Sequence, residues 1–171
     1  MSLLALAAWI ATAGVGLYLL SIWLIEYDKD FHSVAATRLP PAVLASHVTL
    51  AGGGLLVWIG YLVLDADRLA WTAAAALALA ATLGLVMAVR WFGVYREGRE
   101  AARARGPAEH LTLVSEDGPA SRNRGVAVLA PTTHLGPPER NFPLPVVIAH
   151  GTFAAITIAL VLLTALGIGG S

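Results

Sequence analysis

Four long stretches of the chain are almost entirely apolar, and polar segments separate them. A helix that crosses a bilayer needs about 20 mostly apolar residues. By this criterion the pattern predicts membrane-spanning helices over about 3–25, 41–64, 69–94 and 144–168. The runs are apolar on every face rather than along one stripe, which argues against a soluble bundle. The expected fold class is therefore all-α, a four-helix bundle in a single membrane domain over residues 1–171.

Composition agrees with a membrane protein. The chain is 57% hydrophobic and 13% charged, with a mean hydropathy of +0.72, whereas a soluble domain is about half apolar and about a quarter charged. The net charge is zero, so no nucleic-acid partner is expected. The chain has no cysteine, which excludes disulfides, thiolate chemistry, iron–sulfur clusters and covalent c-type haem attachment. The first apolar run is too long for a cleavable signal and is interpreted as a retained span.

The basic residues predict the orientation. The connection after the third span carries seven arginines and the connection after the first carries Lys29 and Arg38, whereas the short hairpin between the second and third spans has only Arg68. Because basic loops remain in the cytoplasm, both termini are expected outside. The expected location is the bacterial plasma membrane, as a multi-pass protein.

The connection over 96–143 is the largest segment outside the spans. It is expected to begin as a helical extension over 96–103. Two short strand-like runs follow, Leu111–Val114 and Val126–Leu129, with turn-forming residues between them. A small cytoplasmic β-hairpin is one interpretation, and lack of order is the other.

Two parts of the chain resemble each other and suggest an internal repeat. The pattern H-x-T-[Leu/Phe]-A occurs at His47 and again at His150. An aromatic pair also precedes each copy at one spacing, Trp23 with Tyr27 and Trp91 with Tyr95. The hypothesis is two direct repeats of a helix pair, related by a pseudo-twofold axis along the membrane normal.

The two histidines are expected at the same depth. Each lies roughly 8–9 Å into its helix at 1.5 Å per residue, on the cytoplasmic side. An ionisable residue within a span is costly and is a functional hypothesis by default. A lone histidine often only bonds a neighbouring carbonyl, but the matched context of His47 and His150 favours a shared ligand.

The expected ligand is one haem b, with His47 and His150 as the two axial ligands of its iron. In an up-down-up-down bundle the second and fourth helices are diagonal, which leaves room for a porphyrin. Small residues one and two turns beyond each histidine are candidates to contact it: Ala51, Gly54, Ala154 and Thr157. Close helix–helix contact is the alternative for these residues and for the glycine run 52–54.

Arg90 is the arginine best placed to pair with the haem propionates. Arg38 and Arg140 are better explained as anchors to lipid phosphates. Three further histidines fall in the connections and are expected to be solvated: His32, His110 and His134. The outward halves of the spans hold no histidine, so a single haem is expected.

Four spans with intramembrane histidines resemble the small cytochrome b561-like b-type cytochromes of bacterial membranes. This resemblance implies a haem and electron transfer, but those proteins typically carry two haems on four histidines, and only one pair is present here. The segments around His47 and His150 also resemble four-span membrane proteins of actinobacteria, a resemblance that implies no activity.

The favoured function is electron transfer within the membrane, with a quinone or a partner subunit, as an electron-transfer or oxidoreductase component. One alternative is a non-catalytic accessory or scaffold subunit of a larger membrane complex, or a homo-oligomer. A small transporter or a divalent-metal site is the third, although the spans offer few polar groups at the midplane. No hydrolase, metalloprotease or phosphate-loop motif occurs.

Overall fold

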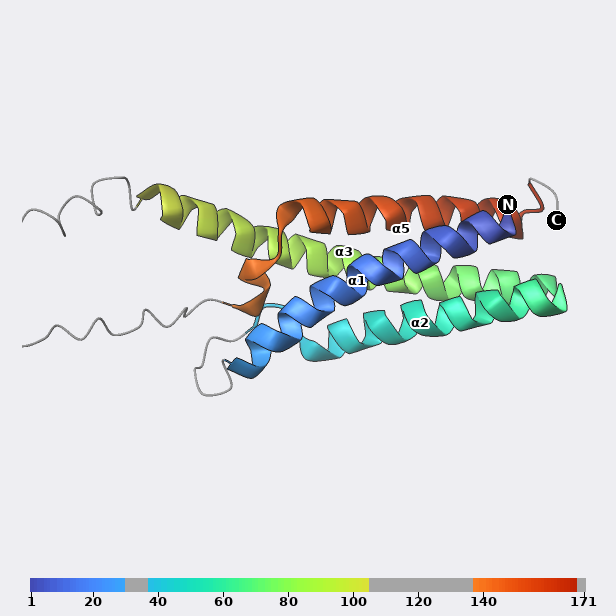
Figure 1. Cartoon of the computed structure of the whole chain (residues 1–171), viewed down its shortest axis with the longest axis horizontal. Helices are drawn as coiled ribbons and strands as arrows, with labels where there is room; N and C mark the ends of the chain where they lie inside the picture. Colours follow the sequence, from blue (N-terminus) through green and yellow to red (C-terminus); the bar gives the residue numbers. More distant parts are fainter. Residues whose placement is uncertain (30–36, 105–136, 169–171) are drawn as a thin grey trace, which may run out of the picture.

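The computed structural model describes residues 1–29, 37–104 and 137–168. Its helices are α1 (Ser2–Lys29), α2 (Pro41–Leu64), α3 (Asp67–Ala104), the short 3-10 helix η1 (Pro138–Asn141) and α5 (Leu144–Ala165). The four long helices are all long and apolar enough to span a bilayer (Figure 1). The all-α class and the multi-pass membrane character are thus confirmed for these ranges. The proposed β-hairpin falls within 105–136, outside the described residues.

The helices begin and end where backbone chemistry favours it. α2 starts directly after Pro40 and α5 directly after Pro143, each with a further proline in its first turn. Proline suits this position because its fixed φ is helical and the first turn needs no N–H donor. α2 ends at Leu64, and the next residue, Asp65, caps it with a left-handed φ of 49° and an N–H that donates to the Tyr61 carbonyl.

The helix bounds differ from the expected spans mainly at their ends. α1 continues to Lys29, and α5 ends at Ala165, short of the expected residue 168. α3 has 38 residues, which is about 57 Å at 1.5 Å per residue. It therefore extends well beyond a hydrocarbon core about 30 Å thick. The helical extension expected over 96–103 is confirmed as the last part of α3.

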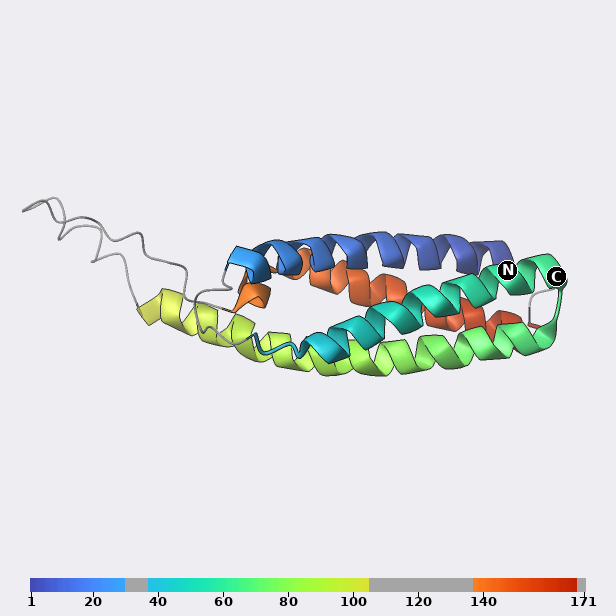
Figure 2. The same cartoon turned by 90° about the horizontal axis from the view of Figure 1, so that it is seen from below.

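The four long helices form two closely packed antiparallel pairs. α1 packs along α5 and α2 along α3, and α3–α5 and α1–α2 are the remaining neighbours. α2 and α5 are thus diagonal across the bundle, as are α1 and α3. Figure 2 shows α1 along one edge of the bundle and α3 along the other, with α2 and α5 crossing between them.

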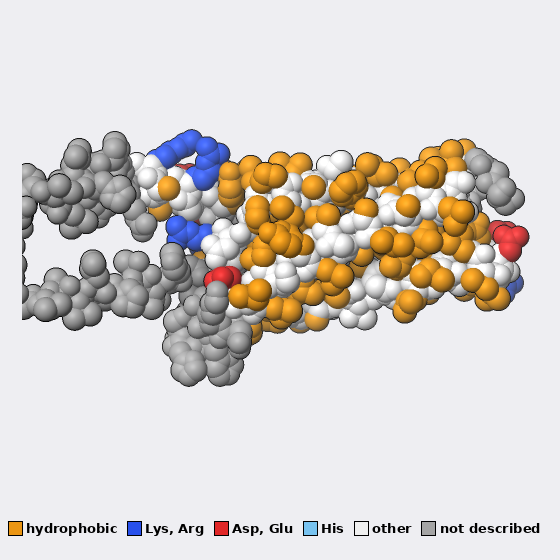
Figure 3. Space-filling view, in the orientation of Figure 1, with side chains coloured by type: hydrophobic (Ala, Val, Ile, Leu, Met, Phe, Trp, Pro, Cys, Tyr) orange, Lys and Arg blue, Asp and Glu red, His pale blue; other side chains and the backbone are white. Residues whose placement is uncertain are grey.

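The bundle has two chemically different ends. Ser2, the turn at Asp65 and the end of α5 lie at one end, which we call the hairpin end (Figure 1). At the opposite end, which we call the arginine end, are residues 37–41, 90–104 and 138–144. Figure 3 shows hydrophobic side chains over the body of the helices and blue basic side chains concentrated at the arginine end.

A buried core occupies the part of the bundle next to the hairpin end, which we call the hairpin half. Trp9 and Trp58 pack with ring centroids 6.4 Å apart, and the Trp58 indole donates to the Ser2 carbonyl at 3.3 Å. Alanines of α3 and Val161 of α5 complete the cluster. A hydroxyl pair, Thr12 and Thr157 at 3.0 Å, borders it on the inner side.

The arginine end is closed by a second buried layer. Trp23, Trp91 and the fully buried Glu139 belong to it. The Glu139 carboxylate accepts from the Arg38 backbone N–H at 2.6 Å and from the Thr37 hydroxyl at 3.0 Å, which joins η1 to the segment before α2. The Arg38 side chain bonds Glu97 at 2.8 Å, and this hydrogen bond raises the pKa of Arg38.

Buried residues of α1 and α3 occur at the same interval in sequence that separates Trp23 from Trp91. Trp23 and Trp91 are both buried, and residues with the same separation in sequence are also buried in pairs: Ala5 with Ala73, Trp9 with Leu77, Thr12 with Ala80. In α2 and α5, residues separated by the same interval as His47 and His150 are also buried in pairs: Gly54 with Thr157, Trp58 with Val161. The helix pairs therefore use equivalent faces, while the repeat itself stays a prediction.

Candidate ligand-binding site

His47 on α2 and His150 on α5 lie next to each other across the bundle diagonal. Their ring centroids are 6.3 Å apart and the ring planes are inclined at 66°. Both side chains are half-buried. The helix prolines explain the matched depth, because the N-cap residues Pro40 and Pro143 start α2 and α5 at the same distance in sequence from His47 and His150.

One nitrogen of each ring is fixed by the main chain of the adjacent helix. The Nδ1 of His47 is 2.8 Å from the Ala80 carbonyl, and the Nδ1 of His150 is 3.1 Å from the Thr12 carbonyl. A carbonyl only accepts, so Nδ1 is the donor in both rings, and in a neutral imidazole Nε2 then keeps its lone pair. Within the described residues neither Nε2 has a protein partner. This is the tautomer in which histidine binds a metal through Nε2.

Two glycines make room for the rings. A Cβ on Gly16 would lie 2.9 Å from Cε1 of His150, and a Cβ on Gly84 would lie 3.2 Å from Cε1 of His47. Gly16 is one helical turn beyond Thr12, and Gly84 is one turn beyond Ala80, the residues whose carbonyls accept the Nδ1–H hydrogen bonds. Sequence reasoning missed both, although each precedes a tryptophan of the repeated aromatic pair by the same interval.

Around the histidines the bundle contains no buried residue among those described, and we call this part the histidine section. It covers the ranges 13–22, 41–53, 81–90 and 144–156. It extends from the layer of Thr12 to that of Trp23, about 16 Å along the helix axis. At the centre of this section the two imidazoles lie next to each other and pack against Gly16 and Gly84.

Two of the predicted contact residues pack against protein instead. A Cβ on Gly54 would lie 3.1 Å from Cζ2 of Trp9 and 3.2 Å from the Cβ of Ala76. Thr157 is fully buried and bonds the Thr12 hydroxyl. For Gly54 and Thr157 the geometry matches the alternative of close helix–helix contact.

The other small residues have different surroundings. Ala51 and Ala154 are half-buried and lie in the histidine section, one turn from its two rings. Gly52 and Gly53 have nothing within 4 Å of an added Cβ and face away from the bundle. The Thr152 hydroxyl bonds the Ile148 carbonyl of its own helix at 2.9 Å, as expected for a threonine in a span.

Arg90 and Trp91 have contrasting surroundings at the arginine end. Arg90 is exposed and its guanidinium donates to the Arg38 carbonyl at 3.2 Å. Trp91 is 6% exposed, and its indole N–H has no hydrogen-bond partner in the described part of the chain. The corresponding indole of Trp23 donates to the Thr37 hydroxyl at 3.4 Å. The three remaining histidines, His32, His110 and His134, lie outside the described residues.

The donor set is unusual for a bare metal ion. The described residues contain no cluster of three or more His, Cys, Asp or Glu side chains that could hold a metal. Protein zinc sites use three or four such ligands. Two imidazoles therefore suit a metal that brings its own remaining ligands, as iron does in a porphyrin.

Comparisons with protein families, with curated proteins and with solved structures find no match to this chain.

Proposed function

We propose that this protein binds one haem b, with Nε2 of His47 and Nε2 of His150 as the axial ligands. The observation that carries the proposal is the shared tautomer: both Nδ1–H groups are committed to backbone carbonyls, which leaves both Nε2 lone pairs available. The two rings lie close enough to hold one group together, with their centroids 6.3 Å apart.

The histidine section supports a large apolar ligand rather than a water or a small ion. Its side chains are mostly aliphatic and, in these described ranges, none of them is buried, whereas buried layers lie on both sides of it. Exposed apolar surface inside a bundle is stabilised when a macrocycle covers it. Ala51 and Ala154 would contact the macrocycle, whereas Gly54 and Thr157 hold the helices together on the hairpin side.

The buried indole N–H of Trp91 supports a ligand that has a carboxylate at the arginine end of the bundle. A buried indole N–H without an acceptor is costly. Trp91 lies on the same face of α3 as Gly84, two turns further on, which is about 10 Å along the axis. A propionate oxygen at that level would accept a hydrogen bond from the Trp91 indole N–H. Arg90, engaged with the Arg38 carbonyl, is the second candidate for the propionates.

The bound haem would supply one-electron redox chemistry. The protein's part would be to hold the iron through both imidazoles, and two protein ligands favour electron transfer over oxygen binding. The site lies nearer one end of the bundle, so a quinone or a partner subunit is needed as the other redox partner. The distribution of basic residues supports termini outside and a bacterial plasma membrane, and the equivalent buried faces support two direct repeats.

Purification from haem-replete cells tests the proposal. We expect a red protein with one haem per chain and b-type bands in its reduced-minus-oxidised spectrum. His47→Ala and His150→Ala should each reduce the haem content at least tenfold. Thr152→Ala is the matched control, because its hydroxyl bonds only its own helix. A colourless wild-type protein would overturn the proposal.

An accessory subunit is a second candidate, and exposed glycines favour it. Gly14, Gly52, Gly53 and Gly151 have nothing within 4 Å of an added Cβ. Small residues on an outward face allow a helix of another subunit to approach closely. If this is the main role, Gly53→Leu should release a partner that copurifies with the wild-type protein, while the haem content is unaffected.

A further inference from the structure

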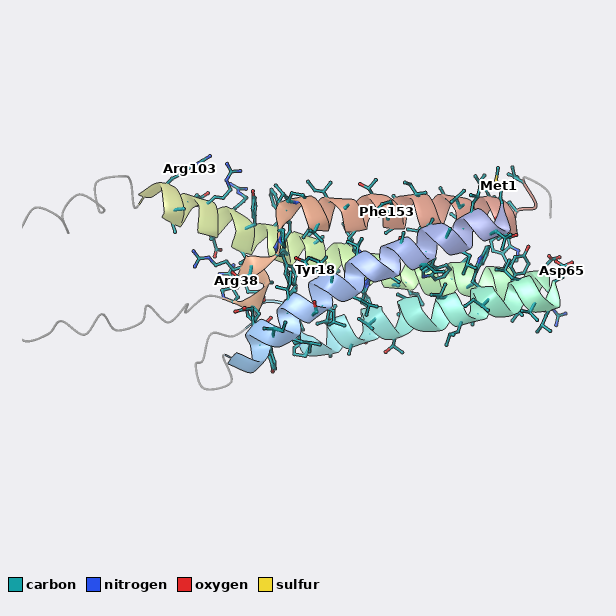
Figure 4. All side chains as sticks on the ribbon, in the orientation of Figure 1. Met1, Tyr18, Arg38, Asp65, Arg103 and Phe153 are labelled. Carbon is teal, nitrogen blue, oxygen red and sulfur yellow. The ribbon has the colours of Figure 1, made fainter. Side chains whose placement is uncertain are left out.

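A hollow of about 430 Å³ lies at the arginine end, beside the part of α3 that extends past the start of α5. Its apolar wall is formed by Phe92 and Tyr95 of α3 and by Leu144 of α5. Its basic rim is formed by Arg96, Arg99 and Arg103. Figure 4 shows Arg103 near the tip of α3, well separated from Arg38 near η1. Among the described residues, this hollow shares only Leu144 with the histidine section.

The three arginines form a strip on one face of α3. Positions three, four and seven residues apart lie on the same side of a helix. One carboxylate, that of Glu100, is 4.0 Å from the Arg96 guanidinium, and both groups are exposed. The Arg99 guanidinium lies 5.8 Å from the centre of the Tyr95 ring. In the described part of the chain Arg99 and Arg103 have no carboxylate partner, so the hollow carries a net positive charge.

The hollow changes from apolar to basic along the helix axis. Phe92 is 51% exposed, and Arg96 and Arg103 follow it by about 6 and 16 Å along α3. This order matches a bilayer surface, where acyl chains give way to phosphates. Guanidinium groups bind phosphate oxygens in a bidentate manner, and apolar side chains below can contact an acyl chain.

We propose that this hollow binds the headgroup of an anionic phospholipid, with its phosphate among the three arginines and one acyl chain along Phe92 and Leu144. An anionic lipid is favoured over a zwitterionic one because the latter brings an ammonium group into a site that already has excess positive charge. Anionic lipids are enriched on the cytoplasmic surface, where the basic loops place this end. The proposal does not depend on haem binding.

Binding of phosphatidylglycerol to the detergent-purified full chain, measured by native mass spectrometry, tests the proposal. We expect retention of phosphatidylglycerol at least tenfold above phosphatidylcholine. Arg99→Gln combined with Arg103→Gln should remove most of that preference. Arg68→Gln, at the hairpin end, is the matched control and should leave it unchanged. Arg99→Lys with Arg103→Lys should retain part of it, because charge remains while the bidentate geometry is lost.

Three results would overturn the proposal. The first is unchanged phosphatidylglycerol binding in the double Gln variant when its helical circular dichroism is normal. The second is equal retention of the two lipids by the wild-type protein. The third is complete displacement of the lipid by an equimolar amount of inorganic phosphate, which would assign the hollow to a free anion.

Discussion

The hairpin half and the histidine section are built from the same four helices and nearly the same apolar residues, yet two indoles meet at the centre of one and two imidazoles at the centre of the other. In the hairpin half, Trp9 and Trp58 meet at the bundle centre and are almost completely buried. In the histidine section, Gly16 and Gly84 occupy the matching inward faces of α1 and α3, and each contacts an imidazole. Residue size at a few inward positions therefore decides which side chains meet at the centre of the bundle.

The polar contacts of the two regions differ as well. In the hairpin half the Thr12 and Thr157 hydroxyls are 3.0 Å apart and each also lies within hydrogen-bond distance of a carbonyl of its own helix, so one hydroxyl can donate to the other while the second donates to its own carbonyl. In the histidine section each imidazole uses one nitrogen and leaves the other without a partner in the described residues. A region with unused donors or acceptors inside a membrane is expected to bind something that satisfies them.

Trp58→Ala should have the largest effect on stability. It removes a fully buried ring from the hairpin half, which costs roughly 3–5 kcal/mol. Thermal unfolding in detergent measures the change. If the two regions are independent, the remaining folded protein should still bind haem. A large loss of haem from the protein that remains folded would contradict the independence of the two regions.

Gly16→Val should damage the histidine section more than the fold. Its side chain would collide with the His150 ring, and overpacking of this kind costs about 1–3 kcal/mol. We expect the haem content to fall below half. Gly14→Val is the control on the same helix, since an added Cβ there meets nothing within 4 Å. Similar haem loss in both variants would show that the contact with His150 is not the cause.

Trp91→Phe should have opposite effects on the stability of the haem-free protein and on its affinity for haem. The substitution removes a buried N–H that has no partner among the described residues, so the stability of the haem-free protein should be unchanged or raised by about 1 kcal/mol. The affinity for haem should instead fall if the indole donates to a propionate. Trp23→Phe is the matched control, because its N–H is bonded to Thr37. Haem titration of the apoprotein checks the prediction, and unchanged affinity would exclude the propionate contact.

Thr12→Val should have the smallest effect. It removes one hydroxyl of the buried pair with Thr157, and interhelical hydrogen bonds of this type average about 0.6 kcal/mol in membrane proteins. Haem binding should be unaffected because His150 bonds the Thr12 carbonyl, not its side chain. Unfolding in detergent and the visible spectrum measure the two outcomes. A loss of haem would mean that the two regions are coupled through this residue.

Local sequence patterns were enough to predict the spans, the helical extension of α3 and the equivalent depth of His47 and His150. Hydropathy and proline positions are properties of single segments, so no knowledge of neighbouring helices was needed. The repeated motif pointed to the histidine pair, but the motif has no information about which carbonyl each ring would contact. The hydrogen bonds of the two Nδ1 atoms became visible only with α1 and α3 in place.

The sequence by itself determined that this chain is a bundle of four membrane helices and which ones carry histidines at one level. The tertiary structure alone decided that Gly54 and Thr157 pack against protein, that Gly16 and Gly84 contact the rings, and that Trp91 is buried without an acceptor. The reason is physical. Nearly every residue of these spans is apolar, so hydropathy cannot tell the inward face of a helix from the face that meets lipid. That choice depends on helix rotation and close packing between neighbours, which small residues and interhelical hydrogen bonds set together.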